Sequence, residues 1–109
     1  MKRPMRGSMR HLGVLRGSGT LSCGGVLLGG ASYEIDGYCT KPGEVVGSGE
    51  ICMAPDELAN AVGRRDLELT TDDGRVLALR FSGTRHDTRR GAAHADIVGG
   101  LPAEDDWQR

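Results

Sequence analysis

Aromatic residues and long apolar runs are scarce in this sequence of 109 residues. Only 4% of the residues are aromatic, with one tryptophan and one phenylalanine among them. Proteins that bind single-stranded nucleic acid usually stack the bases on several aromatic side chains, so this function is disfavoured. The sequence also has no apolar run near the roughly 20 residues of a membrane-spanning helix. We therefore expect no helical membrane segment and no membrane partner.

The sequence motifs of the common enzyme classes are also missing. Neither Gly17-Ser18-Gly19 nor Gly47-Ser48-Gly49 is followed by the third glycine of a dinucleotide-binding loop. Neither of the two lysines belongs to a phosphate-binding P-loop. The sequence has no GxSxG nucleophile elbow and no HExxH zinc motif. We therefore predict no catalytic residues and a protein that is not an enzyme.

The cysteines give no sign of a metal or redox site. Cys23, Cys39 and Cys52 form no CxxC pair, so their spacing suggests neither a zinc ribbon nor a redox disulfide. His94 and Asp96 would share one face of a strand, but two ligands do not make a structural metal site. The basic N-terminus is not followed by the apolar stretch of a signal peptide. We expect no metal, no cofactor and a cytoplasmic location.

Charge is unevenly distributed, although the formal net charge is only −1. Residues 1–33 contain five basic residues and no acidic one, whereas residues 34–73 contain ten acidic and three basic residues. Solvated charges on separate surfaces would explain this pattern. Contact of the basic segments with an anionic partner, and pairing of the N-terminal bases with the acidic body, are the alternatives.

The composition along the chain divides it into three segments. Residues 1–16 contain proline and glycine and little apolar periodicity, so we predict a flexible basic tail. Residues 17–101 are predicted to form a single β domain, and residues 102–109 an acidic C-terminal tail. Trp107 in this tail is expected either to dock on the domain or to anchor a partner.

Alternation of apolar and polar residues predicts an all-β, mostly antiparallel domain. Tyr33 and Ile35 alternate with Glu34 and Asp36, as in a strand with one buried face. Six strands are expected, at residues 19–23, 32–38, 45–53, 66–71, 75–82 and 92–98. They predict a small six-stranded barrel or rolled sheet. The expected core comprises Ile35, Ile51, Leu67, Leu69, Leu77, Leu79, Phe81, Ala95 and Ile97.

One short helix is expected between the third and fourth strands. Pro55 suits a first helical position because it has no N–H to lose there. Apolar residues at positions 58, 61 and 62 share one helix face, and Gly63 suits the left-handed residue that ends a helix. A helix of two turns is unstable alone in water. We therefore expect it to pack on the sheet as a plug over one end of a barrel.

The two Gly-Ser-Gly segments raise the question of an internal repeat. Gly17–Leu21 matches Gly47–Ile51 at an offset of 30 residues. Chance similarity in a glycine-rich chain and true duplication both remain open. If the repeat is real, each half begins with a glycine-kinked strand, as curved small barrels need.

Residues 83–91 contain the strongest candidate for a binding surface. Arg85, Arg89 and Arg90 lie within six residues of one another, and guanidinium groups suit carboxylates and phosphates. Hairpin tips often bind partners, because rigid strands hold an exposed loop, although a simple solvated tip is the alternative. Tyr38 and Trp107 complete the candidate binding set as the aromatic residues expected outside the core.

These observations favour a non-catalytic β-barrel module of a bacterial-type cytoplasmic protein, which binds another protein. The alternative is a binder of nucleic acid or of an anionic ligand. It would use the basic N-terminal tail and the Arg85–Arg90 loop.

Overall fold

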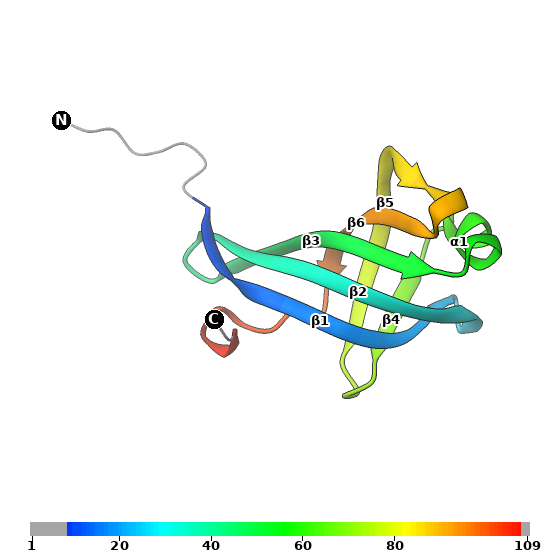
Figure 1. Cartoon of the computed structure of the whole chain (residues 1–109). Helices are drawn as coiled ribbons and strands as arrows, with labels where there is room; N and C mark the ends of the chain where they lie inside the picture. The colour runs from blue at the N-terminus through cyan, green and yellow to red at the C-terminus, as the bar shows by residue number, and fades with distance from the viewer. Residues whose placement is uncertain (1–8, 108–109) are drawn as a thin grey trace.

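The computed structural model describes residues 9–107, apart from the side chains of residues 83–88. Its strands are antiparallel throughout and close into one barrel in the order β1-β2-β3-β6-β5-β4 (Figure 1). The predicted all-β, mostly antiparallel fold with one short helix is therefore confirmed. The elements are β1 (Arg10–Cys23), β2 (Val26–Lys41), β3 (Glu44–Met53), α1 (Pro55–Ala61), β4 (Leu67–Thr71), β5 (Val76–Asp87), η1 (Thr88–Arg90), β6 (Ala92–Gly99) and η2 (Glu104–Asp106).

The chain order explains how the barrel closes. β1, β2 and β3 are neighbours, and the connection through α1 then crosses to the far side, where β4 pairs with β1. β4 reaches β1 only at Gly19–Cys23, and β6 reaches β3 only at Gly47–Cys52. The first part of β1, the last part of β2 and the first residues of β3 therefore project beyond the barrel as a three-stranded extension (Figure 1).

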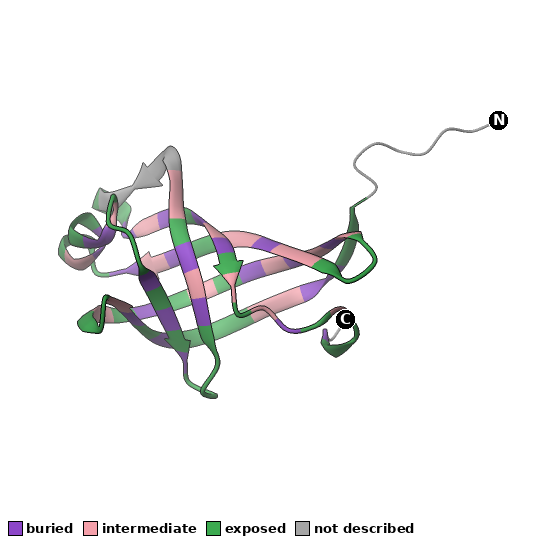
Figure 2. Cartoon of the chain, turned by 180° about the vertical axis from the view of Figure 1, so that it is seen from behind, coloured by how far each residue is buried: buried purple, intermediate pink, exposed green. Residues whose placement is uncertain are grey.

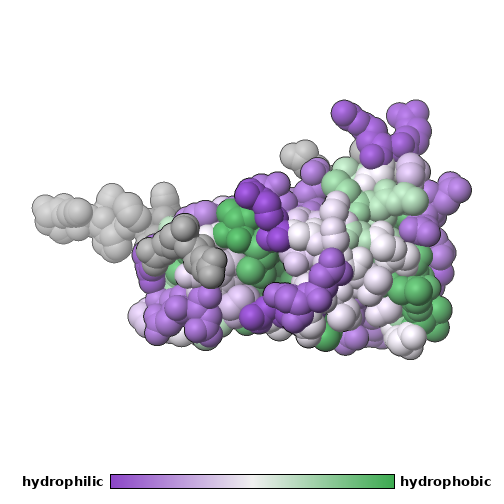
Figure 3. Space-filling model, turned by 60° about the horizontal axis from the view of Figure 1, so that its bottom comes forward, coloured by the Kyte–Doolittle hydropathy of each residue, from purple (hydrophilic) through white to green (hydrophobic). Residues whose placement is uncertain are grey.

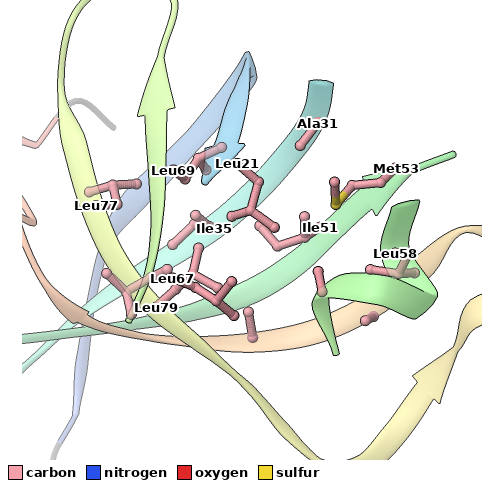
Figure 4. Packing of buried hydrophobic residues seen from close by; sticks show 14 residues of the cluster. Leu21, Ala31, Ile35, Ile51, Met53, Leu58, Leu67, Leu69, Leu77 and Leu79 are labelled. Atoms are coloured by element: carbon pink, nitrogen blue, oxygen red, sulfur yellow. The ribbon is translucent and has the colours of Figure 1, made fainter. Parts of the chain in front are cut away.

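The core lies where the sequence alternation predicts it. Buried and exposed residues alternate along the strands (Figure 2), and the inward side chains form one cluster (Figure 4). Eight of the nine expected core residues belong to this cluster; Phe81, expected to be buried, is only partly buried and packs against it. Leu58 and Ala61 from α1 join the same cluster. The helix therefore packs on the sheet at one end of the barrel, as predicted (Figure 1).

The ends of α1 follow the local sequence signals. Pro55 occupies the first turn, and Gly63 adopts φ +92° directly after the last helical turn. A left-handed φ is accessible to glycine at little steric cost, so Gly63 lets the chain turn sharply. Gly63 has the predicted left-handed φ, but the chain already leaves the helix at the C-cap Val62, which is extended, so Gly63 shapes the turn after the cap.

Several predicted boundaries are wrong, and the strand expected at residues 32–38 runs from Val26 to Lys41. Residues 10–16, assigned to the flexible tail, form the first half of β1, in which Leu12 is fully buried. The sequence obscures this strand because a bulge between His11 and Gly13 shifts the alternation by one residue. The strand ending at residue 82 instead continues to Asp87, so the expected loop of residues 83–91 is mostly β5 and η1.

The last glycine of each Gly-Ser-Gly segment lies where the backbone of a neighbouring strand of the barrel approaches closely. A Cβ atom at Gly19 would overlap the carbonyl oxygen of Thr70, and one at Gly49 would overlap that of Glu34. Only glycine allows the neighbouring backbone to approach so closely. The similarity is thus explained by packing, whether or not the halves arose by duplication.

Candidate functional site

Four of the five predicted binding residues fall into two groups at opposite ends of the molecule (Figure 1). Arg89 and Arg90 lie exposed in η1, beside α1. The side chain of Arg85 lies outside the described part of the structure. Tyr38 and Trp107 lie on the three-stranded extension. The structure therefore does not unite the candidates in one site, and each end is treated separately below.

Trp107 is docked on the extension. It is only 8% exposed and packs against Leu12 and Cys39, while its Nε1 donates a hydrogen bond to the Pro102 carbonyl at 3.1 Å. Of the two alternatives stated for this residue, docking is the one observed. Residues 102–107, expected as an acidic tail, are therefore folded against the domain; we call residues 101–107 the C-terminal strap.

A row of glycines forms the floor beneath the strap. Gly13, Gly37 and Gly47 are directly opposite one another on β1, β2 and β3. A Cβ atom at Gly37 would overlap the Trp107 ring, and one at Gly47 would lie 3.0 Å from the Leu101 side chain. The absence of side chains in this row thus creates the space that the strap fills. We call this surface, walled by Leu12 and Cys39, the glycine cradle.

Tyr38 faces away from the cradle. Side chains alternate along β2, so Tyr38 lies on the outer surface while Gly37 and Cys39 face the strap. The Tyr38 ring packs edge-on against His11, with ring centroids 5.2 Å apart, and His11 Nε2 lies 3.0 Å from Asp36 Oδ1. Tyr38 and Trp107 therefore share one end but not one surface.

Glu104 ties the strap to both edges of the extension. Its carboxylate lies 2.5 Å from the Arg10 guanidinium and accepts a hydrogen bond from the Gly43 N–H at 3.1 Å. The hydrogen bond from Gly43 is the largest cause that lowers the pKa of Glu104, followed by Cys39 and Arg10. The nearby Cys39 thiol has a raised pKa, mainly because of burial and secondly because of Glu104. The docked strap therefore favours an ionised Glu104 and a neutral Cys39.

We expect the strap to loosen in acid before the barrel unfolds. A carboxyl group whose pKa is lowered on docking stabilises the docked state above its usual pKa of 4.5, and this contribution is lost as the pH falls through the lowered value. The emission of Trp107, the only tryptophan, should shift to the red below about pH 4.5, ahead of the far-UV circular dichroism change. Glu104→Gln should abolish this early shift, and an identical pH profile in the variant would contradict the assignment.

Two large apolar residues are exposed at the opposite end. Val26 and Leu27 follow the β1–β2 turn with 65% and 66% exposure, and Figure 3 shows apolar surface at this end of the molecule. The Cys23 thiol donates to the Arg65 carbonyl at 3.0 Å, which holds the exposed Arg65 beside the hairpin. With Arg89 and Arg90 of η1, which packs on α1, these residues constitute what we call the α1-end surface.

An open groove of about 530 Å³ adjoins this surface. Ser18, Ser32 and Cys52 form a row of opposed residues across β1, β2 and β3 on its floor, and Arg90 lies at its margin. The floor is therefore made of small polar side chains beside a guanidinium group. Such a surface can donate hydrogen bonds to an extended or anionic ligand.

The N-terminal bases within the described part of the chain pair with the body. Arg10 contacts Glu104, and Arg16 Nη2 lies 2.8 Å from Glu34 Oε2. Of the alternatives for the uneven charge, pairing of tail and body is thus present at these two residues. Both pairs are exposed, and such pairs contribute at most about 1 kcal/mol to stability.

No group of three or more metal-ligating side chains occurs among the residues that the structure describes. Asp96 of the proposed two-ligand pair accepts a hydrogen bond from Ser82 at 3.0 Å, and His94 is exposed beside it. Within residues 9–107, the structure contains no helix that is long and apolar enough to cross a membrane.

The sequence contains a signal for the exposed hairpin. Val26-Leu27-Leu28 is preceded by Gly24-Gly25 and followed by Gly29-Gly30. Gly24 and Gly25 both adopt positive φ and make the turn. An apolar run next to a glycine pair therefore marked a hairpin tip, where apolar side chains project into solvent.

Comparison with known proteins identifies no relative: no family model matches the chain, and no curated protein or solved structure matches it significantly.

Proposed function

We propose that this protein is a non-catalytic module that binds another protein through its α1-end surface. The observation that carries the proposal is the exposure of Val26 and Leu27, one on each face of β2, at the tip of the β1–β2 hairpin. Single apolar residues on a surface need no explanation, but two at one hairpin tip, with arginines at the same end of the molecule, resemble the composition of an interface centre. Partner proteins bury such residues in a pocket, where few side chains supply most of the affinity.

The charges around the hairpin indicate the chemistry of the partner. Arg65 is exposed beside the hairpin, and Arg89 and Arg90 are exposed in η1, which packs on α1 at the same end of the molecule (Figure 1). A partner with an apolar pocket and an acidic rim would complement this surface. The three free cysteines support the proposed cytoplasmic location, because thiols stay reduced there.

Replacing both hairpin residues by serine should abolish partner binding without unfolding the protein. Interface anchors commonly contribute more than about 1 kcal/mol each, so V26S/L27S should weaken binding by roughly tenfold or more. The test is to isolate the partner with the intact protein, purify it, and measure its Kd for both forms by calorimetry. Val98→Ser, also exposed but on β6, is the matched control and should bind normally. An unchanged Kd for V26S/L27S would remove the basis for this surface.

The alternative function is binding of nucleic acid or an anionic ligand. It is favoured by the position of Arg90, which lines the groove together with Ser18 and Ser32. The same variants distinguish the two functions. Salt-sensitive binding of a polyuridine oligonucleotide that R89E/R90E loses and V26S/L27S retains would support the alternative. The described residues around the groove include no aromatic side chain for base stacking, which is why we rank this function second.

A further inference from the structure

The C-terminal strap is attached to the barrel without strand pairing. Within the described part of the chain, its backbone makes no backbone hydrogen bond to the sheet, and the Asp106 N–H bonds to Ala103 inside the strap itself. Side chains make the attachment: Trp107 and Leu101 on the cradle, and Glu104 with Arg10 and Gly43. A segment held in this way can detach without breaking the sheet.

The strap also has its own small core. Leu12, Cys39 and Trp107 form a cluster distinct from the large one inside the barrel, whose buried members include no strap residue, although Leu101 packs against both. Removing the strap therefore leaves the barrel core in place. Opening of such a peripheral unit requires less free energy than global unfolding, so the cradle is transiently vacated in the native protein.

A glycine hinge connects the strap to β6. Gly100 adopts φ +89°, and a Cβ atom there would overlap the Val76 carbonyl oxygen. The chain can therefore turn back onto its own cradle only because residue 100 is glycine. If residue 100 cannot adopt this turn, the strap and the cradle each keep their surfaces. The strap then no longer reaches the cradle of its own molecule.

We propose that the glycine cradle also binds the C-terminal strap of a second copy of this chain, which gives a strap-exchanged dimer. The strap is the segment that the structure shows seated in the cradle, so its shape and its Glu104–Arg10 contact fit a second copy as they fit the first. Exchange of identical segments is a low-cost route to dimers. At low protein concentration each cradle holds the strap of its own chain, because the tether gives that strap a high effective concentration. The fraction of dimer rises as the protein concentration rises.

A hinge substitution should favour exchange. In Gly100→Val, the strained turn disfavours the closed monomer, and the dimer dissociation constant should fall by about tenfold or more. Size-exclusion chromatography with light scattering measures the dimer, while Trp107 emission should remain that of a buried indole. Gly74→Val is the matched control: it has a similar φ of +92° at the β4–β5 turn and should stay monomeric. A monomeric Gly100→Val protein with buried Trp107 would overturn the proposal.

A complementation experiment tests the proposal without the hinge variant. Trp107→Ala supplies a cradle whose own strap lacks its indole anchor and the fluorophore, and Gly37→Val supplies an intact strap beside a filled cradle. Mixing the two chains should shift the tryptophan emission to the blue and form a heterodimer, whereas mixing Gly37→Val with itself should not. If the chains fail to combine, exchange between copies is refuted. If a free peptide of the strap sequence enters the cradle of Trp107→Ala but the two full chains do not combine, the strap of a second copy is likewise refuted as the occupant.

Discussion

Replacing Leu79 by alanine is expected to destabilise the protein by about 2–5 kcal/mol. Leu79 is 3% exposed on β5, directly opposite Leu67 of β4 and Ile97 of β6. Its side chain thus fills the barrel where three strands meet, and alanine would leave a cavity there. A chain of this size has only a small stability margin, because it buries a modest fraction of its unfolded surface. The substitution should therefore unfold a large part of the population at ambient temperature.

Urea unfolding followed by far-UV circular dichroism measures this effect. Val76→Ala is the matched control, because Val76 lies on the same strand but is 46% exposed. The control should change the free energy of unfolding by less than about 1 kcal/mol. An equal loss in the two variants would show that the inward and outward faces of β5 have been confused.

The fold class follows from the sequence because one face of each main strand must be apolar. The alternation around Ile35 and around Leu67 and Leu69 fixes which residues enter the core, and Asp73-Gly74 fixes the hairpin that joins β4 to β5. These signals are local, so they remain readable without knowledge of the strand order. The short helix was predictable for the same reason, since its start and end are encoded in adjacent residues.

The extension was not predictable by the same reasoning. The first half of β1 contains Gly13, Gly17 and a bulge, which interrupt the alternation. Its burial depends on Trp107, which lies far away in sequence, and no local pattern indicates that contact. The glycine row under the strap likewise becomes visible only when the register of three strands is known.

The predicted binding residues lie at two separate ends of the molecule for a related reason. Composition identified arginines and exposed aromatics as binding residues, but the closure of the barrel places η1 at one end and the β2–β3 turn at the other. Tyr38 and Arg90 are therefore far apart, although both were reasonable candidates. The apolar hairpin at Val26 and Leu27 was not predicted, because the expected strands at residues 19–23 and 32–38 leave these two residues in the connection between them.

Replacing Gly49 by alanine should destabilise the barrel by about 1–3 kcal/mol, and more if the strands cannot shift. A Cβ atom at this position would overlap the Glu34 carbonyl oxygen and lie 2.7 Å from the Cα atom of Ile35. Both obstacles are backbone atoms of β2, so no side-chain rotation relieves them. β2 and β3 would have to separate where Gly49 pairs with Ile35, in the middle of the ladder. Thermal unfolding followed by circular dichroism would detect the resulting loss.

Two further alanine substitutions show whether the close approach itself is responsible. Gly19→Ala should have a similar effect, because its Cβ atom would overlap the Thr70 carbonyl oxygen at the junction of β1 and β4. Gly30→Ala is the matched control in β2, since the nearest atom to its Cβ, the Gly19 carbonyl oxygen, lies at 3.9 Å. The control should be neutral or slightly stabilising, because alanine reduces the freedom of the unfolded chain. If all three variants unfold at the same temperature as the parent protein, the strands are not packed as closely as the two Gly-Ser-Gly segments indicate. Losses confined to positions 19 and 49 would establish these glycines as the points that set the barrel's width.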